Sequence, residues 1–119
     1  MTKVTNITDF LETGIKAAGL RHNAIANNIA NLETADYRRL DIRFEQLLQK
    51  ALDSAGPVRP DQIQPEIHQP KQTPVKSNGN DVNLEGEIGQ MLKNILRYKT
   101  YVRLLNKKYD QIERAMKVQ

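Results

Sequence analysis

The side chains of this sequence that could do chemistry are few and far apart. The two histidines are His22, within an apolar helical pattern, and His68, within a proline-rich segment, so they lack the i, i+4 spacing of a helical metal site. The sequence contains no cysteine, which excludes disulfide bonds, thiolate nucleophiles and cysteine-based zinc sites. We therefore predict no catalytic residue, no cofactor and no metal site, and we interpret His22 as a packed or register-setting residue.

Phosphate and nucleic-acid binding have equally little support. Neither GxGxxG nor GxxxxGK[ST] occurs, so no glycine loop is present to hold a nucleotide. The net charge is +4, from 18 basic and 14 acidic residues that are interspersed along the chain. In the basic C-terminal region Asp110 and Glu113 interrupt the lysines and arginines, whereas a DNA-binding zipper has a denser basic stretch before its heptads. We predict a solvated charged face, with no nucleic acid and no small-molecule substrate as partner.

No apolar run approaches the ~20 residues that span a bilayer, and the first residues lack the apolar core of a cleaved secretory signal. We therefore expect a soluble chain that, if it leaves the cytoplasm, does so by a route without a cleaved signal. The absence of cysteine is compatible with the cytosol and with passage through an oxidising compartment.

The strongest pattern in the sequence predicts a long helix from Leu84 to about Lys117. Asn83 is a suitable N-cap, and Glu85 and Glu87 fall in the first turn, where the helix dipole favours acids. Apolar residues then follow in unbroken steps of four and three, which is a heptad seam. The seam comprises Leu84, Ile88, Met91, Ile95, Tyr98, Val102, Leu105, Tyr109, Ile112 and Met116. A helix of about 50 Å is too long for this chain to bury alone, so the surplus seam predicts burial against other copies or other chains.

A second seam predicts a helix from about Asp9 to Leu32. Asp9 and Glu12 have the spacing of a capping box. The seam comprises Leu11, Ile15, Ala18, His22, Ile25, Ile29 and Leu32. Gly14 and Gly19 each weaken a helix by roughly 1 kcal/mol relative to alanine, and such residues mark places where another backbone comes close.

Between these helices we predict a short helix within residues 38–52 and an irregular segment. Phe44, Leu47, Leu48 and Leu52 share one helical face. All five prolines fall between residues 57 and 74, where the few aliphatic residues are too sparse for a buried strand. The predicted fold is all-α: a helical region 1–52, a flexible, partly disordered Pro/Gln/Asn-rich linker 53–82, and a long helix 83–119.

Asparagines recur every four residues on the first helix, at Asn23, Asn27 and Asn31, with Asn28 beside them. Asparagine is unfavourable within a helix, so a compensation is expected. Two interpretations remain open: the amides hydrogen-bond across helices and fix their register at an interface, or they form a simple polar outer face.

The stretch from Leu20 to Asn31, LRHNAIANNIAN, followed by Thr34 and Tyr37, closely resembles the N-terminal signature of flagellar rod, hook and related axial proteins. One departure is that Ala35-Asp36 replaces the Pro-Gly that usually precedes the tyrosine; aspartate tolerates turn conformations, so we expect a turn to persist. The short length, together with residues 44–48, 80–85 and 96–98, resembles the proximal-rod subunit nearest the inner-membrane ring.

The resemblance implies a structural component of the bacterial flagellar proximal rod, not an enzyme, built from coiled-coil helices in the basal body. It implies other rod subunits, the junction protein between rod and inner-membrane ring, and the flagellar type III export apparatus as partners, with a cytoplasmic stage before export. The alternative from another class is a small cytoplasmic helical DNA-binding or chaperone-like protein. Our hypothesis for the assembly interface, in which the asparagines set the inter-subunit register, comprises Leu11, Ile15, Ala18, Ile25, Asn27, Asn28, Ile29, Asn31, Leu84, Ile88, Met91, Ile95, Tyr98, Val102, Leu105, Tyr109 and Ile112.

Overall fold

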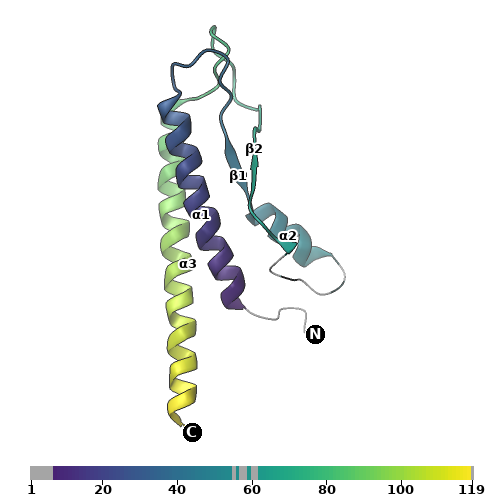
Figure 1. Ribbon diagram of the computed structural model, residues 1–119, viewed down its shortest axis with the longest axis vertical. Coiled ribbons are helices and arrows are strands. Elements are labelled where there is room, and N and C mark those ends of the chain that lie inside the picture. Colours follow the sequence, from purple (N-terminus) through teal and green to yellow (C-terminus); the bar gives the residue numbers. More distant parts are fainter. Residues whose placement is uncertain (1–6, 55, 57–58, 60–61, 119) are drawn as a thin grey trace.

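Two long antiparallel helices dominate the computed structural model, which describes residues 7–54, 56, 59 and 62–118 (Figure 1). Helix α1 spans Ile7–Ala30 and α3 spans Leu84–Val118. They lie side by side, and the C-terminal end of α3 extends well beyond the start of α1 (Figure 1). None of the described helices is long and apolar enough to cross a membrane.

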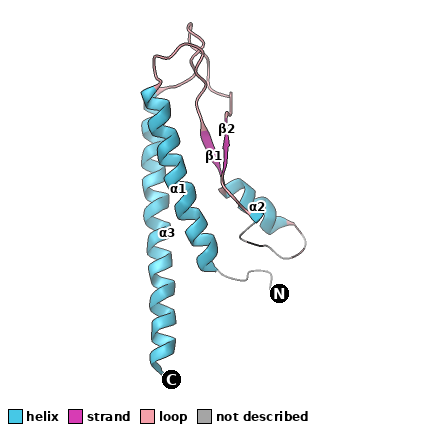
Figure 2. Cartoon of the chain, in the orientation of Figure 1, coloured by secondary structure: helices cyan, strands magenta, loops and turns pink. Residues whose placement is uncertain are grey.

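A small antiparallel ribbon lies beside α1, so the expectation of an all-α chain is only partly confirmed (Figure 2). Strand β1, Asp41–Arg43, pairs with β2, Glu66–His68, and Ile42 lies opposite Ile67. Ile42 is buried and Ile67 is largely exposed, so β2 contributes backbone hydrogen bonds without an apolar face of its own. A strand held in that way leaves little apolar pattern in the sequence. It falls within the segment that we predicted to be an irregular linker.

The helix boundaries follow the predictions with small corrections. Helix α1 begins at Ile7, so Asp9 lies within the first turn and the predicted capping box at Asp9 is wrong. The N-cap of α3 is confirmed, because the Gly86 backbone N–H donates to Asn83 Oδ1 at 2.8 Å. The predicted short helix is α2, Glu45–Asp53.

Beyond the C-terminal end of α1, residues 34–37 form a turn that contacts residues 78–79 of the segment before α3. Asp36 adopts a left-handed backbone with φ of 60°, and the Tyr37 N–H donates to the Thr34 carbonyl at 3.4 Å. The Asp36 N–H also donates to the Asn78 carbonyl at 2.9 Å. Gly79 faces Asp36 with φ of 85°, and a Cβ at Gly79 would overlap the Asp36 carboxylate. Aspartate therefore occupies the left-handed position in place of the usual glycine, and the expected turn is present.

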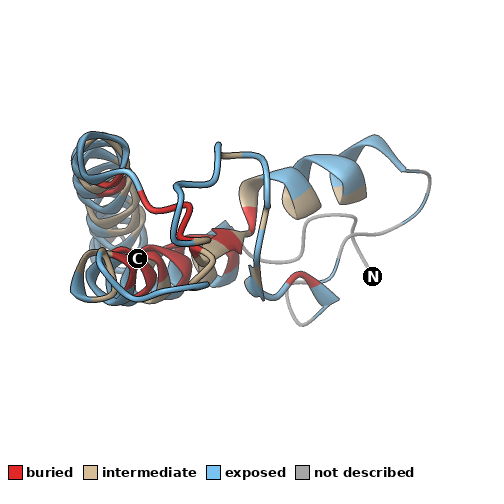
Figure 3. Cartoon of the chain, turned by 90° about the horizontal axis from the view of Figure 1, so that it is seen from above, coloured by how far each residue is buried: buried red, intermediate tan, exposed pale blue. Residues whose placement is uncertain are grey.

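A small apolar core lies where α2 meets α1. Its buried members are Phe10, Ala17, Phe44 and Ile63. Leu47, Leu48 and Ala51 of α2 pack against them, as the predicted apolar face requires, but Leu52 is 40% exposed and does not join them. Buried residues gather along α1 and the segment beside it, and α2 lies at the periphery (Figure 3). A core of this size leaves the pairing of α1 with α3 to other interactions.

Candidate assembly surface and the polar ladder beneath it

Helices α1 and α3 meet through three layers spaced seven residues apart in both helices. In the first layer the ring of Tyr101 packs directly on Gly14, where an added Cβ would lie 2.8 Å from the ring. Gly14 thus marks a close approach, but the neighbour is an aromatic ring and not the backbone that was predicted. The second layer pairs Arg21 with Asn94, and the third pairs Asn28 with Glu87. We call these layers and their hydrogen-bond partners the polar ladder.

The Arg21 layer joins four elements through one nearly buried guanidinium. Arg21 Nη2 donates to Glu45 Oε1 at 2.7 Å and to the Ile42 carbonyl at 3.2 Å, while Nη1 donates to Asn94 Oδ1 at 3.3 Å. The Asn94 amide in turn donates to the Ala18 carbonyl at 2.8 Å. One side chain of α1 therefore fixes α3, β1 and the first turn of α2 together.

The Asn28 layer uses a fully buried amide (0% exposed) to tie α1 to the segment before β1 and to α3. Asn28 Nδ2 donates to the Leu40 carbonyl at 2.9 Å and to Glu87 Oε1 at 2.8 Å. Asn28 Oδ1 accepts from the Leu40 N–H at 2.8 Å and from the Tyr37 hydroxyl at 2.9 Å. All four hydrogen-bonding positions of this amide are thereby used within the chain.

The Glu87 carboxylate is buried and receives a charged partner as well. Arg39 Nε donates to Glu87 Oε2 at 2.7 Å. Burial disfavours the charge of Arg39, but its hydrogen bond and ion pair with Glu87 outweigh burial and raise its pKa. Beside this pair, Asp81 Oδ1 accepts from the Arg39 backbone N–H at 2.6 Å, and Asp81 Oδ2 accepts from Arg38 Nε at 3.0 Å.

Among the described residues, no buried side-chain nitrogen or oxygen lacks a hydrogen-bond partner. The ladder is therefore a fully connected buried network, the kind that rigidifies and specifies one arrangement of its elements. The stability of the fold should be sensitive to substitution in this network. Removing one member leaves its charged or polar partner buried without a hydrogen bond.

Glu45 and Tyr101 couple α2 to α3 and shift one another's protonation. The Tyr101 hydroxyl donates to Glu45 Oε2 at 2.7 Å. Burial raises the pKa of Tyr101, and the bond to the Glu45 carboxylate raises it further, to about 12. Burial alone would raise the pKa of Glu45, but the Tyr101 hydroxyl and the Arg21 guanidinium together lower it.

The predicted apolar seams lie mostly to one side of this ladder. On α1, Leu11, Ala18 and Ile25 are buried, Ile15 and Ile29 are partly buried, and His22 is exposed, so our interpretation of His22 as a packed residue is wrong. No seam residue of α3 is buried: Met91, Val102 and Leu105 are partly buried, and the exposed members are Leu84, Ile88, Ile95, Tyr98, Tyr109, Ile112 and Met116. Helix α3 instead turns Glu87, Asn94 and Tyr101 towards α1.

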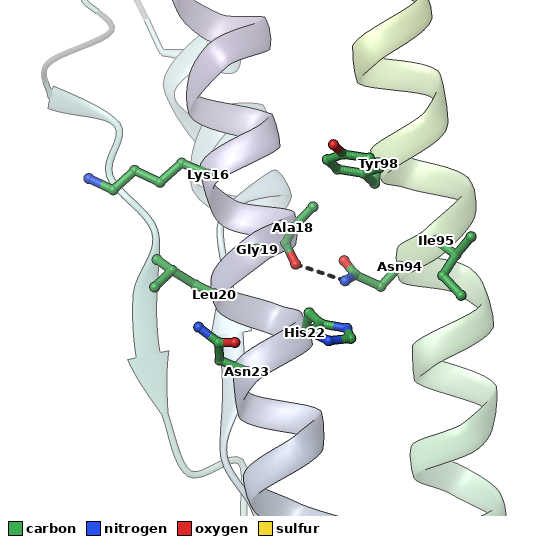
Figure 4. Close-up of a pocket in the computed structure, with 9 residues that line it drawn as sticks. All are labelled: Lys16, Ala18, Gly19, Leu20, His22, Asn23, Asn94, Ile95 and Tyr98. Carbon is green, nitrogen blue, oxygen red and sulfur yellow. Dashed lines mark hydrogen bonds between the residues drawn. The ribbon is translucent and has the colours of Figure 1, made fainter.

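A groove of about 520 Å³ runs between the helices on the outer side of the ladder (Figure 4). Ala18, Gly19 and His22 line it from α1, and Asn94, Ile95 and Tyr98 line it from α3. In the close-up, the side chains of His22, Asn94 and Tyr98 lie between the two helices, and the bond from Asn94 to the Ala18 carbonyl forms part of the floor (Figure 4). No group of three or more His, Cys, Asp or Glu residues in the described ranges could hold a metal ion.

The chain was compared with known proteins. No family model matches it. It is 23% identical over 115 residues to the flagellar basal body rod protein FlgB of Bacillus subtilis, a match that covers 89% of each chain. It is 26% identical over 108 residues to FlgB of Aeromonas hydrophila, with 82% of each chain covered, and 24% identical over 108 residues to FlgB of Borreliella burgdorferi, with 76% of this chain and 80% of the relative covered.

The three comparisons confirm the resemblance to flagellar basal-body rod proteins. All three relatives are rod proteins of the flagellar basal body, which agrees with the prediction that the chain is structural and not an enzyme. The residues that carried the resemblance also carry the ladder, since Arg21, Asn28 and Tyr37 lie within the signature and Asp81 lies within the second matching stretch. In this structure the signature therefore encodes contacts within one chain.

The asparagines illustrate the same point. Asn27 Nδ2 donates to the Tyr37 hydroxyl at 2.7 Å, and Asn31 Nδ2 donates to the Asn27 carbonyl at 2.8 Å. Thr34 Oγ1 donates to Asn31 Oδ1 at 3.0 Å. Asn28 is buried, so it presents no exposed atom to a neighbouring subunit, whereas Asn23 is exposed. Of the two interpretations left open, register across helices applies to Asn28, but between helices of the same chain.

The sequence analysis did not predict that charged and polar residues hold α1 and α3 together. These residues are Arg21, Arg39, Glu87 and Asn94. Glu87 was predicted only as a favourable first-turn acid. A usable signal was present: Arg21 and Asn28 are seven residues apart, as are Glu87, Asn94 and Tyr101, so each set recurs on one side of its helix.

We predict that Glu87→Gln lowers the free energy of unfolding by about 3 kcal/mol, because the buried Arg39 guanidinium loses its closest charged partner and keeps only the 3.9 Å ion pair with Asp41. Urea denaturation of the purified chain measures this. Glu85→Gln, in the same helical turn but exposed, is the matched control and should change stability by less than about 0.5 kcal/mol. Equal effects of the two substitutions would contradict the ladder.

We also predict a stability contribution from Glu45 that depends on pH. Folding lowers its pKa, so the contribution is complete above the ordinary value of 4.5 and is lost as the pH falls through the folded pKa. Thermal melts between pH 7 and pH 3 should therefore show a shallower loss of stability in Glu45→Gln than in the unaltered chain. The exposed Glu33→Gln serves as control, and an acid profile of Glu45→Gln identical to that of the unaltered chain would refute the role of Glu45.

Proposed function

We propose that this chain is a subunit of the flagellar proximal rod that assembles with itself and with other rod subunits through the exposed apolar face of α3. Its place is the basal body, at the junction between the rod and the inner-membrane ring. Its partners are other rod subunits, the junction protein and the flagellar type III export apparatus, which takes it from the cytoplasm. The similarity to flagellar basal body rod proteins supports the basal body as its location and other rod subunits as its partners.

The single observation that carries the assembly role is the apolar surface along α3. Ile88, Ile95 and Tyr98 are 40–48% exposed, and Leu92 and Leu96, one step further round the helix, are 57% and 66% exposed. Further along, Tyr109, Ile112 and Met116 are 48%, 51% and 72% exposed. A contiguous apolar surface of this kind on a small protein marks an interaction site, because leaving it in water forfeits its burial energy.

The partner of this surface has to be another chain, since α1 already occupies the polar side of α3. Glu87 and Asn94 point towards α1 and are held there by the ladder. Rotating α3 to bury Ile95 or Tyr98 against α1 would expel these polar groups from all their partners. The ladder thus keeps the apolar stripe turned outward and available for neighbouring subunits.

The ladder also suits a subunit that transmits torque. It joins α1, α3, β1 and α2 by short hydrogen bonds and ion pairs, so the helix pair and the ribbon move as one body. A stiff unit transmits twist across its interfaces with less internal deformation than a chain whose helices slide.

We predict that Ile95→Asp removes the chain from the rod while leaving its fold intact, since Ile95 is 40% exposed in the free chain. A charge at this position cannot be buried against a neighbouring helix without a large desolvation cost. The test is mass spectrometry of purified hook–basal-body particles from the source bacterium, which should contain the unaltered chain and lack the variant.

Thr100→Asp, which adds the same charge at an exposed position of α3 outside the apolar stripe, is the matched control and should remain in the particles. Comparable helicity and expression of both variants separate assembly from folding. Incorporation of Ile95→Asp at the level of the control would contradict the assigned surface, and absence of the unaltered chain from intact particles would contradict the rod function itself.

A further inference from the structure

No packing contact among the described residues requires a glycine at position 19. Gly14, on the same helix, is required by the ring of Tyr101, but a Cβ added at Gly19 would meet no atom within 4 Å. Glycine destabilises an exposed helix more than any residue except proline. Its presence therefore suggests that a neighbouring group comes too close for a side chain to fit. The described chain supplies no such neighbour at Gly19.

Gly19 lies on the groove between α1 and α3, and the groove is apolar where the two helices approach. Ala18 forms part of its floor, Ile95 and Tyr98 form the α3 side, and each of the latter is at least 40% exposed. Without a Cβ at Gly19, a helix laid along the groove can approach α1 more closely than at a position with a side chain.

Resting on the rod function proposed above, we infer that this groove receives the C-terminal end of α3, residues 109–118, from a second copy of the chain. By the seven-residue steps of the ladder, Ile7 lies level with Lys108, so no described residue of α1 lies alongside residues 110–118. This C-terminal segment exposes Ile112 and Met116, and beside them Tyr109, whose hydroxyl alone reaches back to Glu12 Oε1 at 3.1 Å. It is the described helical segment with the least cover from its own chain (Figure 1).

Charge is compatible with this pairing of surfaces. From Ile88 to Tyr109, α3 contains no acidic residue and six basic ones. Lys16 lines the groove from α1, and Lys99 lies one helical turn after the groove residue Ile95. Asp110 and Glu113, the only acids in α3 after Glu87, both fall in the C-terminal segment. Glu113 is exposed and engages only Lys117 of its own helix, at 3.1 Å. Residues 109–118 also contain Arg114 and Lys117 and so carry no net charge, whereas the rest of α3 after Glu87 is basic. Docking would therefore place the least basic part of α3 beside Lys16 and Lys99, and its apolar residues against an apolar groove.

Docking of the C-terminal segment in the groove determines the axial shift between the two copies. Ile112, at the centre of the segment, is 16 residues from the level of the groove at Leu96, which is about 24 Å along a helix. A second copy in the same orientation, shifted axially by that distance, brings its C-terminal segment into the groove of the first. Because the two contacting surfaces are different, the contact is heterologous and repeats without closing, as a filament requires.

Cysteine cross-linking of the full chain tests this, since the natural sequence has no cysteine. In Lys99→Cys/Glu113→Cys the two thiols lie about 21 Å apart within one chain, too far for an internal disulfide, and adjacent between docked copies. Mild oxidation of the purified chain at high concentration should give dimers, trimers and larger species on a non-reducing gel. Lys50→Cys/Glu113→Cys, with its first thiol on exposed α2, should remain monomeric.

A second experiment blocks the groove with a glutamine side chain. Gly19→Gln should reduce cross-linking at least tenfold while raising the melting temperature by about 4 °C, because it replaces a helical glycine in open space. Gly89→Gln, also in open space but outside the groove, should raise the melting temperature similarly and leave cross-linking unchanged.

Each other outcome overturns the inference. Equal cross-linking in both cysteine pairs, or full cross-linking in Gly19→Gln, shows that the groove is not the site. Dimers without larger species show a closed pair in place of the staggered contact. If the cysteine pair links only to a different protein in isolated basal bodies, another rod subunit fills the groove. In these cases the unaltered chain would still be found in the particles, so the rod function would stand while the docking failed.

Discussion

The buried carboxylate of Glu87 is the interaction on which the rest of the structure depends. It accepts from Asn28 of α1 and from Arg39 of the segment that leads into β1, so one side chain of α3 is bonded to both. A buried charge is tolerated only when it is paired and hydrogen-bonded, and here every such requirement is met within the chain. The register of the two long helices follows from this, since sliding α3 by one residue separates the carboxylate from both donors.

The same constraint decides which face of α3 is left for other chains. A heptad stripe would ordinarily pair with the nearest apolar helix, and α1 has such a stripe. Three layers at seven-residue spacing, two of them polar, pair the helices on a different face, and the apolar stripe of α3 remains outside. In the described part of the chain, the buried polar side chains are therefore hydrogen-bonded internally, while the apolar stripe of α3 stays exposed, as the proposed assembly requires.

The predictions from sequence were accurate where a feature depended on periodicity or on local backbone chemistry. Both long helices, the N-cap at Asn83 and the short helix α2 follow from such patterns, and the turn at Asp36 follows from the tolerance of aspartate for a left-handed backbone. The strand β2 was missed because it is held by backbone bonds to β1 and exposes Ile67, so no apolar alternation marks it. The seam of α3 was recognised, but its outward orientation depends on Glu87 and Asn94, whose partners lie 59 and 73 residues away. Pairings over such separations leave no local pattern.

Hydroxyl-radical footprinting of α3 tests the central claim most directly, namely that its apolar stripe is open in the free chain and covered in the rod. The account predicts rapid oxidation of Tyr98, Tyr109 and Met116 in the purified chain and strong protection of the same residues in isolated basal bodies. Phe44, which is buried within the chain, should be protected in both and serves as the internal reference. Equal oxidation of the stripe in the free chain and in the particle would show that assembly uses another surface, and would contradict the account.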